Sequence, residues 1–164
     1  MVSGDETKSI IIESDSTVHV QNVASVNITG NESTTSIISI TGDAYSNGND
    51  GTITSSGPII VDSSTTGNNS ASLLVLESNN GDILVENISV SSESINSISP
   101  TAVSQVLISA PNGELLIDGS PELSSTAIGS SANPGTAISY FGIGEDGVNP
   151  ANPDINSVID DRDD

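Results

Sequence analysis

The chain has 164 residues, and its 22 Asp and Glu residues against 2 Lys and Arg give a formal net charge of -20. Because binding to nucleic acids or to anionic membranes requires clustered cations, this composition excludes both kinds of partner. The chain has no cysteine, so it has neither disulfides nor thiolate metal sites, and its one histidine cannot form an imidazole metal cluster. No apolar run approaches the roughly 18 residues of a membrane span.

Ile, Val, Leu and Phe together make up 43 of the 164 residues, or 26%. This share lies above the roughly 20% that is typical of disordered acidic chains. Ile and Val dominate the set, and their β-branched side chains favour strands. We therefore expect a folded all-β chain, with disorder confined mainly to the last 20 residues, which hold seven of the acids.

Short apolar runs follow one another along the whole chain and are separated by Gly, Asn, Asp, Ser and Pro. Short apolar runs that are separated by turn-forming residues predict strands joined by turns. The runs lie at residues 10–12, 18–20, 26–28, 37–40, 52–54, 59–61, 73–76, 83–85, 88–90, 106–108 and 115–117.

The runs also repeat as a group. Residues 74–87 and 106–119 both give a strand, an Asn-Gly turn followed by an acid, a second strand and another acid before a corner. Looser versions of this unit place the four starts near residues 9, 37, 73 and 105. The units are joined by irregular Ser-, Thr- and Asn-rich connectors at 31–36, 63–72 and 91–104. Three short strands per unit predict about four three-stranded coils of a parallel β-solenoid. An antiparallel β-sandwich stays open as the alternative, because Asn-Gly turns also join hairpins.

This pattern divides the chain into four parts. We expect an N-terminal lead over residues 1–8, the solenoid repeat region over 9–129, a capping strand within 130–143 and an acidic, flexible tail over 144–164. Tyr140 and Phe141 are two of the three aromatic residues, and we expect them to plug the open apolar end of the stack.

Strand alternation sorts the apolar residues into two faces. The inward set is Ile10, Ile12, Val18, Val20, Ile38, Ile40, Ile83, Val85, Val106, Ile108, Leu115 and Ile117. The outward set is Ile11, Ile60, Val75, Leu84, Leu107 and Leu116. Ile11, Leu84, Leu107 and Leu116 are therefore candidate interface residues toward identical subunits or neighbouring repeats of a larger chain. The alternative is that the connector at 91–104 folds over this face.

Three segments carry a resemblance to a known protein family: Gly-Thr-Ile-Thr-Ser-Ser-Gly at 51–57, Gly-Asp-Ile-Leu-Val-Glu-Asn at 81–87 and Asn-Gly-Glu-Leu-Leu-Ile-Asp-Gly at 112–119. They resemble the repeat regions of filamentous-haemagglutinin-like exoproteins, which are large bacterial surface adhesins. The resemblance covers about residues 9–125. It implies a right-handed parallel β-helix at the cell surface that serves as a stalk or adhesive shaft without catalysis.

An enzymatic reading rests on carboxylates alone, because both cations, Lys8 and Arg162, lie outside the repeat. Two carboxylates at a suitable separation could hydrolyse a glycosidic bond. The candidates are Asp43, Asp50, Asp62, Asp82, Glu86, Glu114 and Asp118. Against this, sugar sites also use stacked aromatic residues, and the repeat holds only Tyr45. We expect these acids to be solvated turn and edge residues, and His19 to be a surface strand residue.

The sequence thus predicts a non-enzymatic, extracellular or cell-surface structural or adhesive module. Alternatives are a self-assembling subunit of an extracellular filament or sheath, or a virion or tail-fibre component, since no signal peptide follows Met1. Surface carbohydrate is a candidate ligand. Ca²⁺ bound by the acidic C-terminal tail is the one cofactor that the residues suggest.

Overall fold

The structure is a computed structural model that describes residues 5–43, 51–96 and 98–144. These residues form strands and turns only, so this part of the chain holds no helix that is long and apolar enough to cross a membrane. The strands are β1 (Glu6–Ser14), β2 (Val18–Val20), β3 (Ala24–Gly30), β4 (Thr34–Gly42), β5 (Ile53–Ser55), β6 (Ile59–Thr65), β7 (Asn69–Ser78), β8 (Ile83–Val85), β9 (Ile88–Ile95), β10 (Thr101–Ser109), β11 (Leu115–Ile117), β12 (Glu122–Ile128) and β13 (Thr136–Ile143).

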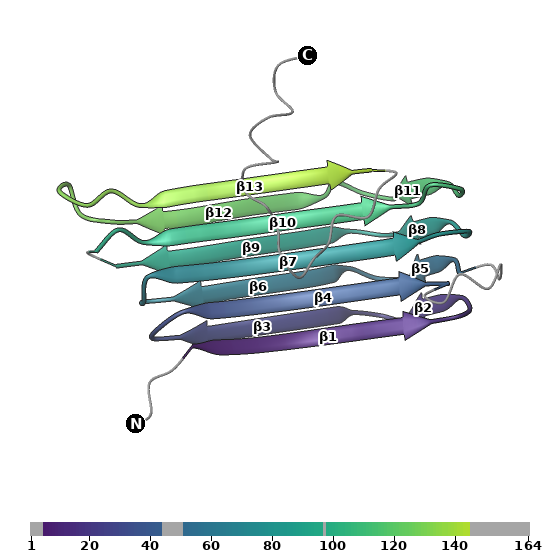
Figure 1. Cartoon of the computed structure of the whole chain (residues 1–164), viewed down its shortest axis with the longest axis horizontal. Coiled ribbons are helices and arrows are strands. Elements are labelled where there is room, and N and C mark those ends of the chain that lie inside the picture. The colour runs from purple at the N-terminus through teal and green to yellow at the C-terminus, as the bar shows by residue number, and fades with distance from the viewer. Residues whose placement is uncertain (1–4, 44–50, 97, 145–164) are drawn as a thin grey trace, which may run out of the picture.

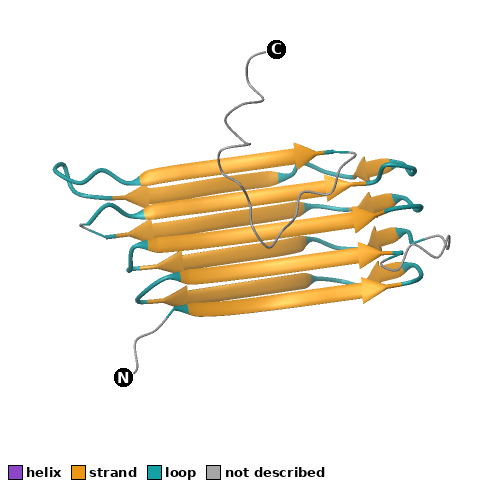
Figure 2. Cartoon of the chain, in the orientation of Figure 1, coloured by secondary structure: helices purple, strands orange, loops and turns teal. Residues whose placement is uncertain are grey.

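The strands stack into three sheets that wind around one core (Figure 1). Sheet A has the order β1-β4-β7-β10-β13, sheet B has β11-β8-β5-β2, and sheet C has β12-β9-β6-β3. Each coil contributes one strand to each sheet, and β13 adds a fifth strand to sheet A. Seen in Figure 2, the long strands of sheets A and C face each other and the short strands of sheet B close one side.

Every pairing between these strands is parallel. The fold class predicted from the repeat is therefore confirmed, with four three-stranded coils wound in a right-handed sense (Figure 1). The antiparallel sandwich is wrong. Asn80-Gly81 and Asn112-Gly113 form corners between sheets A and B and do not form hairpins.

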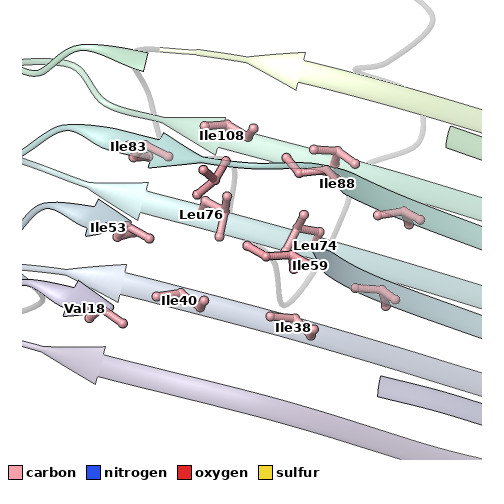
Figure 3. Packing of buried hydrophobic residues seen from close by; sticks show 14 of the residues in the cluster. Val18, Ile38, Ile40, Ile53, Ile59, Leu74, Leu76, Ile83, Ile88 and Ile108 are labelled. Carbon is pink, nitrogen blue, oxygen red and sulfur yellow. The ribbon is translucent and has the colours of Figure 1, made fainter. Parts of the chain in front are cut away.

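The core is a column of Ile, Val and Leu side chains inside the coils (Figure 3). Ile38, Leu74 and Val106 occupy successive coils of one inward row and are fully buried. All twelve residues that alternation placed inside belong to this column or pack against it. Stacking in register explains this, because the alternation of one strand is repeated at about 4.8 Å in the next coil.

A second inward column consists of hydroxyl side chains between sheets A and C, opposite the end closed by sheet B. Its fully or nearly buried members are Thr34, Ser36, Ser63, Thr65, Ser70, Ser72, Ser92, Ser94 and Ser104. They belong to strands, so treating residues 63–72 and 91–104 as irregular connectors is wrong. The sheets are bridged directly: Ser72 Oγ donates to the carbonyl oxygen of Ser91 at 2.5 Å, and Ser92 Oγ to that of Val103 at 2.7 Å.

The hydroxyl column predicts a measurable hydrogen-bond contribution. In Ser72→Ala, the lost bond to the Ser91 carbonyl should lower the free energy of unfolding by about 1 kcal/mol, because a buried acceptor loses its donor. Urea denaturation measures the change. Ser25→Ala, at an exposed outward position of sheet C, is the control and should leave stability within about 0.5 kcal/mol. Equal effects of the two substitutions would contradict a stabilising hydroxyl column.

The two ends of the described chain differ from the expected boundaries. β1 begins at Glu6, inside the segment expected to be a lead. β13 pairs with β10 as a further parallel strand, and Phe141 packs against the main core as a plug should. Tyr140 instead faces outward from sheet A. The remainder of the acidic tail, residues 145–164, lies outside the described residues.

Candidate contact surfaces

The four candidate interface residues do not share one surface. Ile11 and Leu107 lie in one outward row of sheet A, whereas Leu84 and Leu116 lie together in the outward row of sheet B. Ile11 is 65% exposed and Leu116 57% exposed, while Leu84 is half-buried. Leu107 is only 7% exposed, so the expectation that it is free for a partner is wrong.

Leu107 is buried because it belongs to an apolar cluster on the outer face of sheet A. This outer cluster comprises Leu73, Val75 and Leu107, with Ile37 and Tyr140 packed against them. The Tyr140 side chain lies close over the backbone of Gly142, since a β-carbon at Gly142 would be 2.8 Å from the ring carbon Cε1 and from the phenolic oxygen. The alternative cover for this face, a loop at 91–104, is wrong, because most of that segment forms β9 and β10.

Beside the outer cluster, at the carboxyl ends of β7, β10 and β13, is a small pocket. Val75, Leu107 and Tyr140 contribute apolar surface, and Glu77 and Ser109 contribute polar groups. The pocket joins the outer cluster to the end of the last strand of sheet A. It is the apolar hollow on this face where a side chain from another molecule could insert.

The outward row of sheet B runs through His19, Thr54, Leu84 and Leu116. His19 Nδ1 lies 2.7 Å from Thr54 Oγ1 in the next coil, so the imidazole is a surface strand residue as expected. The two leucines continue the row on the later coils. Sheet B therefore presents a narrow ridge that changes from polar to apolar along the stack.

The outer face of sheet C is mainly polar, although Ile60, Ile95 and Ile128 also lie on it. Asp62 is held between neighbouring coils, because Asn27 Nδ2 donates to its Oδ2 at 2.6 Å and Ser91 Oγ donates to its Oδ1 at 2.5 Å. A shallow hollow next to this ladder is lined by hydroxyls and two acids: Thr29, Asp62, Ser64, Ser91, Ser92, Glu93, Ser124 and Thr126. These groups can exchange hydrogen bonds with a hydroxyl-rich ligand.

The other candidate carboxylates are distributed over the corners. Asp82 Oδ1 accepts a hydrogen bond from the Glu114 amide at 2.7 Å, so this pair caps the start of the last two strands of sheet B. Asp43 is fully buried and accepts a hydrogen bond from Asn80 Nδ2. Glu86 and Asp118 follow β8 and β11 at the next corner.

These placements put the acids at two corners of the stack and on the outer face of sheet C. Within residues 5–43, 51–96 and 98–144, His and acidic side chains nowhere gather in a group of three or more that could hold a metal ion. Asp50, and the tail proposed for Ca²⁺, lie outside the described residues. The acids thus contribute hydrogen bonds between coils at some positions and charge to the surface at others.

The outer cluster and the hydroxyl column are the features that the sequence interpretation missed. A signal for the column was present, since Thr34 and Ser36, Ser70 and Ser72, and Ser92 and Ser94 continue the two-residue alternation of the apolar runs. The position of Tyr140 over the leucines of neighbouring strands had no comparable signal, because it depends on the register between coils.

No protein-family model, no curated protein and no solved structure matches this chain.

Proposed function

We propose that this chain is a non-enzymatic structural module of an extracellular or cell-surface protein of the filamentous-haemagglutinin-like kind. The observation that carries the proposal is the uninterrupted register of the parallel strands from β1 to β13 in sheet A. Each coil is held to the next by the backbone of all three sheets. A stack built this way is stiff and can be lengthened by adding coils, which suits a stalk.

The same module has surfaces that suit adhesion. The polar face of sheet C offers hydroxyl and carboxylate groups held at fixed positions, as in the ladder around Asp62. Such a face fits surface carbohydrate better than an anionic polymer, because the one Lys or Arg among the described residues, Lys8, lies on β1 of sheet A. Asp82 and Glu114, which precede paired strands of sheet B, are joined by a hydrogen bond from the Glu114 amide to Asp82 Oδ1, so these acids help to hold neighbouring coils together.

Coil duplication tests the structural role. β7 and β10 pair with Asn69 opposite Thr101, so residues 69–100 correspond to one complete coil. We expect each copy of this segment inserted after Pro100 to add about 4.8 Å along the stacking axis. Small-angle X-ray scattering of chains with zero, two and four added copies should show a linear increase in length at constant cross-section.

A matched control separates added coils from added chain. A scrambled segment of the same length and composition, inserted at the same place, should raise the radius of gyration without the strand signal in circular dichroism. If duplicated coils behaved like the scrambled segment, the chain could not serve as an extendable stalk and the proposed function would be wrong.

A filament or sheath subunit is the second candidate function. It is favoured by the exposed Ile11 and Leu116 and by the outer backbone edges of β11, β12 and β13, which are unpaired within the described residues. Multi-angle light scattering over a range of concentrations decides between the two. Concentration-dependent polymers would support a filament, and a strict monomer would rule it out.

A further inference from the structure

One inward row of sheet A has the same chemistry in the later coils. Ser36, Ser72 and Ser104 are paired in register along this row. Each Oγ donates to a carbonyl oxygen on the facing strand of sheet C, at 2.6 Å to Asp62, 2.5 Å to Ser91 and 2.6 Å to Ser124. These serines are fully or nearly buried, so the row accommodates a small side chain between two close sheets.

In the first coil this position is occupied by a lysine. Lys8 pairs with Ser36, and its Nζ donates to the carbonyl oxygen of Asn27 at 3.1 Å. Asn27 and Asp62 are register partners on neighbouring strands of sheet C. Lys8 therefore donates to the carbonyl that corresponds, one coil earlier, to the Asp62 carbonyl bonded by Ser36. The substituted position keeps the bridge between sheets A and C but replaces a hydroxyl with an ammonium group.

The inward position two residues before Lys8 also has a charged residue where the later coils have a hydroxyl. Glu6 pairs with Thr34, which pairs with Ser70 in the third coil. Both charged side chains are exposed, because β1 is the edge strand of sheet A. Ile28 on β3, the residue after Asn27, is nevertheless only 1% exposed. To reach Asn27, the aliphatic part of Lys8 must cross from β1 to β3 at this end of the stack.

We propose that Glu6 and Lys8 close the N-terminal end of the stack to pairing with a second copy of this chain. The outer backbone edge of β1, which no other described strand pairs with, would otherwise be a template for another strand. A strand added there would force an inward carboxylate and an inward ammonium out of water, which opposes association unless both ions are well paired. Contact between coils of different copies is thereby restricted to the other end of the stack, at β11, β12 and β13.

The test replaces Glu6 and Lys8 with the residue types found at the corresponding positions of the second coil, Thr34 and Ser36. Glu6→Thr with Lys8→Ser removes one acid and one base, so the formal net charge of -20 is unchanged and altered repulsion cannot explain the result. Glu6→Gln with Lys8→Gln is a second neutral pair, and it keeps longer side chains at both positions. Glu6→Lys with Lys8→Glu is the control, because it exchanges the charges and leaves both inward.

Sedimentation velocity over a range of concentrations gives the readout, and circular dichroism confirms that each variant is folded. We expect both neutral pairs to form larger species than the parent chain, increasing with concentration, and the charge-exchanged control to sediment like the parent. Unchanged sedimentation of the folded neutral pairs, or equal association of the charge-exchanged control, would overturn the proposal. Neither result depends on whether the stack serves as a stalk.

Discussion

Leu74→Ala should lower the free energy of unfolding by about 3 kcal/mol. Leu74 is fully buried in the middle of the inward row formed with Ile38 and Val106 (Figure 3). The coils above and below are held in place by their backbone ladders, so the space left by the shortened side chain cannot collapse easily. Chemical denaturation followed by circular dichroism measures the loss.

Ile11→Ala is the matched control for this substitution. Ile11 is an aliphatic residue on a strand of the same sheet, but it is 65% exposed. Its truncation should change stability by no more than about 0.5 kcal/mol. If Ile11→Ala cost as much as Leu74→Ala, the assignment of the inner and outer faces of sheet A would be wrong.

Gly57→Ala should cost about 3 kcal/mol or more, because the corner between sheets B and C has no room for a β-carbon. A β-carbon at Gly57 would overlap the carbonyl oxygen of Asn22 in the coil below. Both partners are backbone, so relief requires the first two coils to move apart. Thermal and urea denaturation measure the loss.

Ser120→Ala provides the comparison, since Ser120 lies exposed at the same kind of corner after β11. It should leave the free energy of unfolding within about 0.5 kcal/mol of the parent. A Gly57→Ala chain as stable as the Ser120→Ala chain would show that the backbones of neighbouring coils are not in contact at this corner.

The coil count and the inner apolar face could be predicted from the sequence, because both follow from local periodicity. Four similar units, the first three with three apolar runs each and the last with two, predict four coils once the runs are assigned to strands. Inward residues such as Ile38 and Ile83 are recognisable since alternation within one strand is independent of its neighbours.

The extent of the strands was harder to predict. Serine and threonine are common in turns, so residues 63–72 were interpreted as a connector although most of them belong to β6 and β7. Their hydroxyls are accommodated because the facing strands come close enough to accept hydrogen bonds, as Ser70 Oγ shows at 2.8 Å from the Ser63 carbonyl oxygen. That proximity is a property of the packed stack.

The outer surface was the least predictable part. Leu107 points outward as alternation requires, yet Leu73, Val75 and Tyr140 from neighbouring strands surround it. Which residues become neighbours depends on the offset between coils, and irregular turns change that offset along the sequence. Candidate contact residues therefore could not be grouped correctly before the register was known.

The most direct test of the stacked-coil architecture measures a distance along the stack. Thr7 and Ile138 lie in one outward row of sheet A, joined through Thr35, Ala71 and Val103. Four strand steps place their α-carbons about 19 Å apart. Since the chain has no cysteine, spin labels can be attached specifically at Thr7→Cys and Ile138→Cys. Pulsed electron paramagnetic resonance should give one narrow distance distribution close to this spacing. A broad distribution, or one centred far beyond it, would contradict a stack of parallel coils.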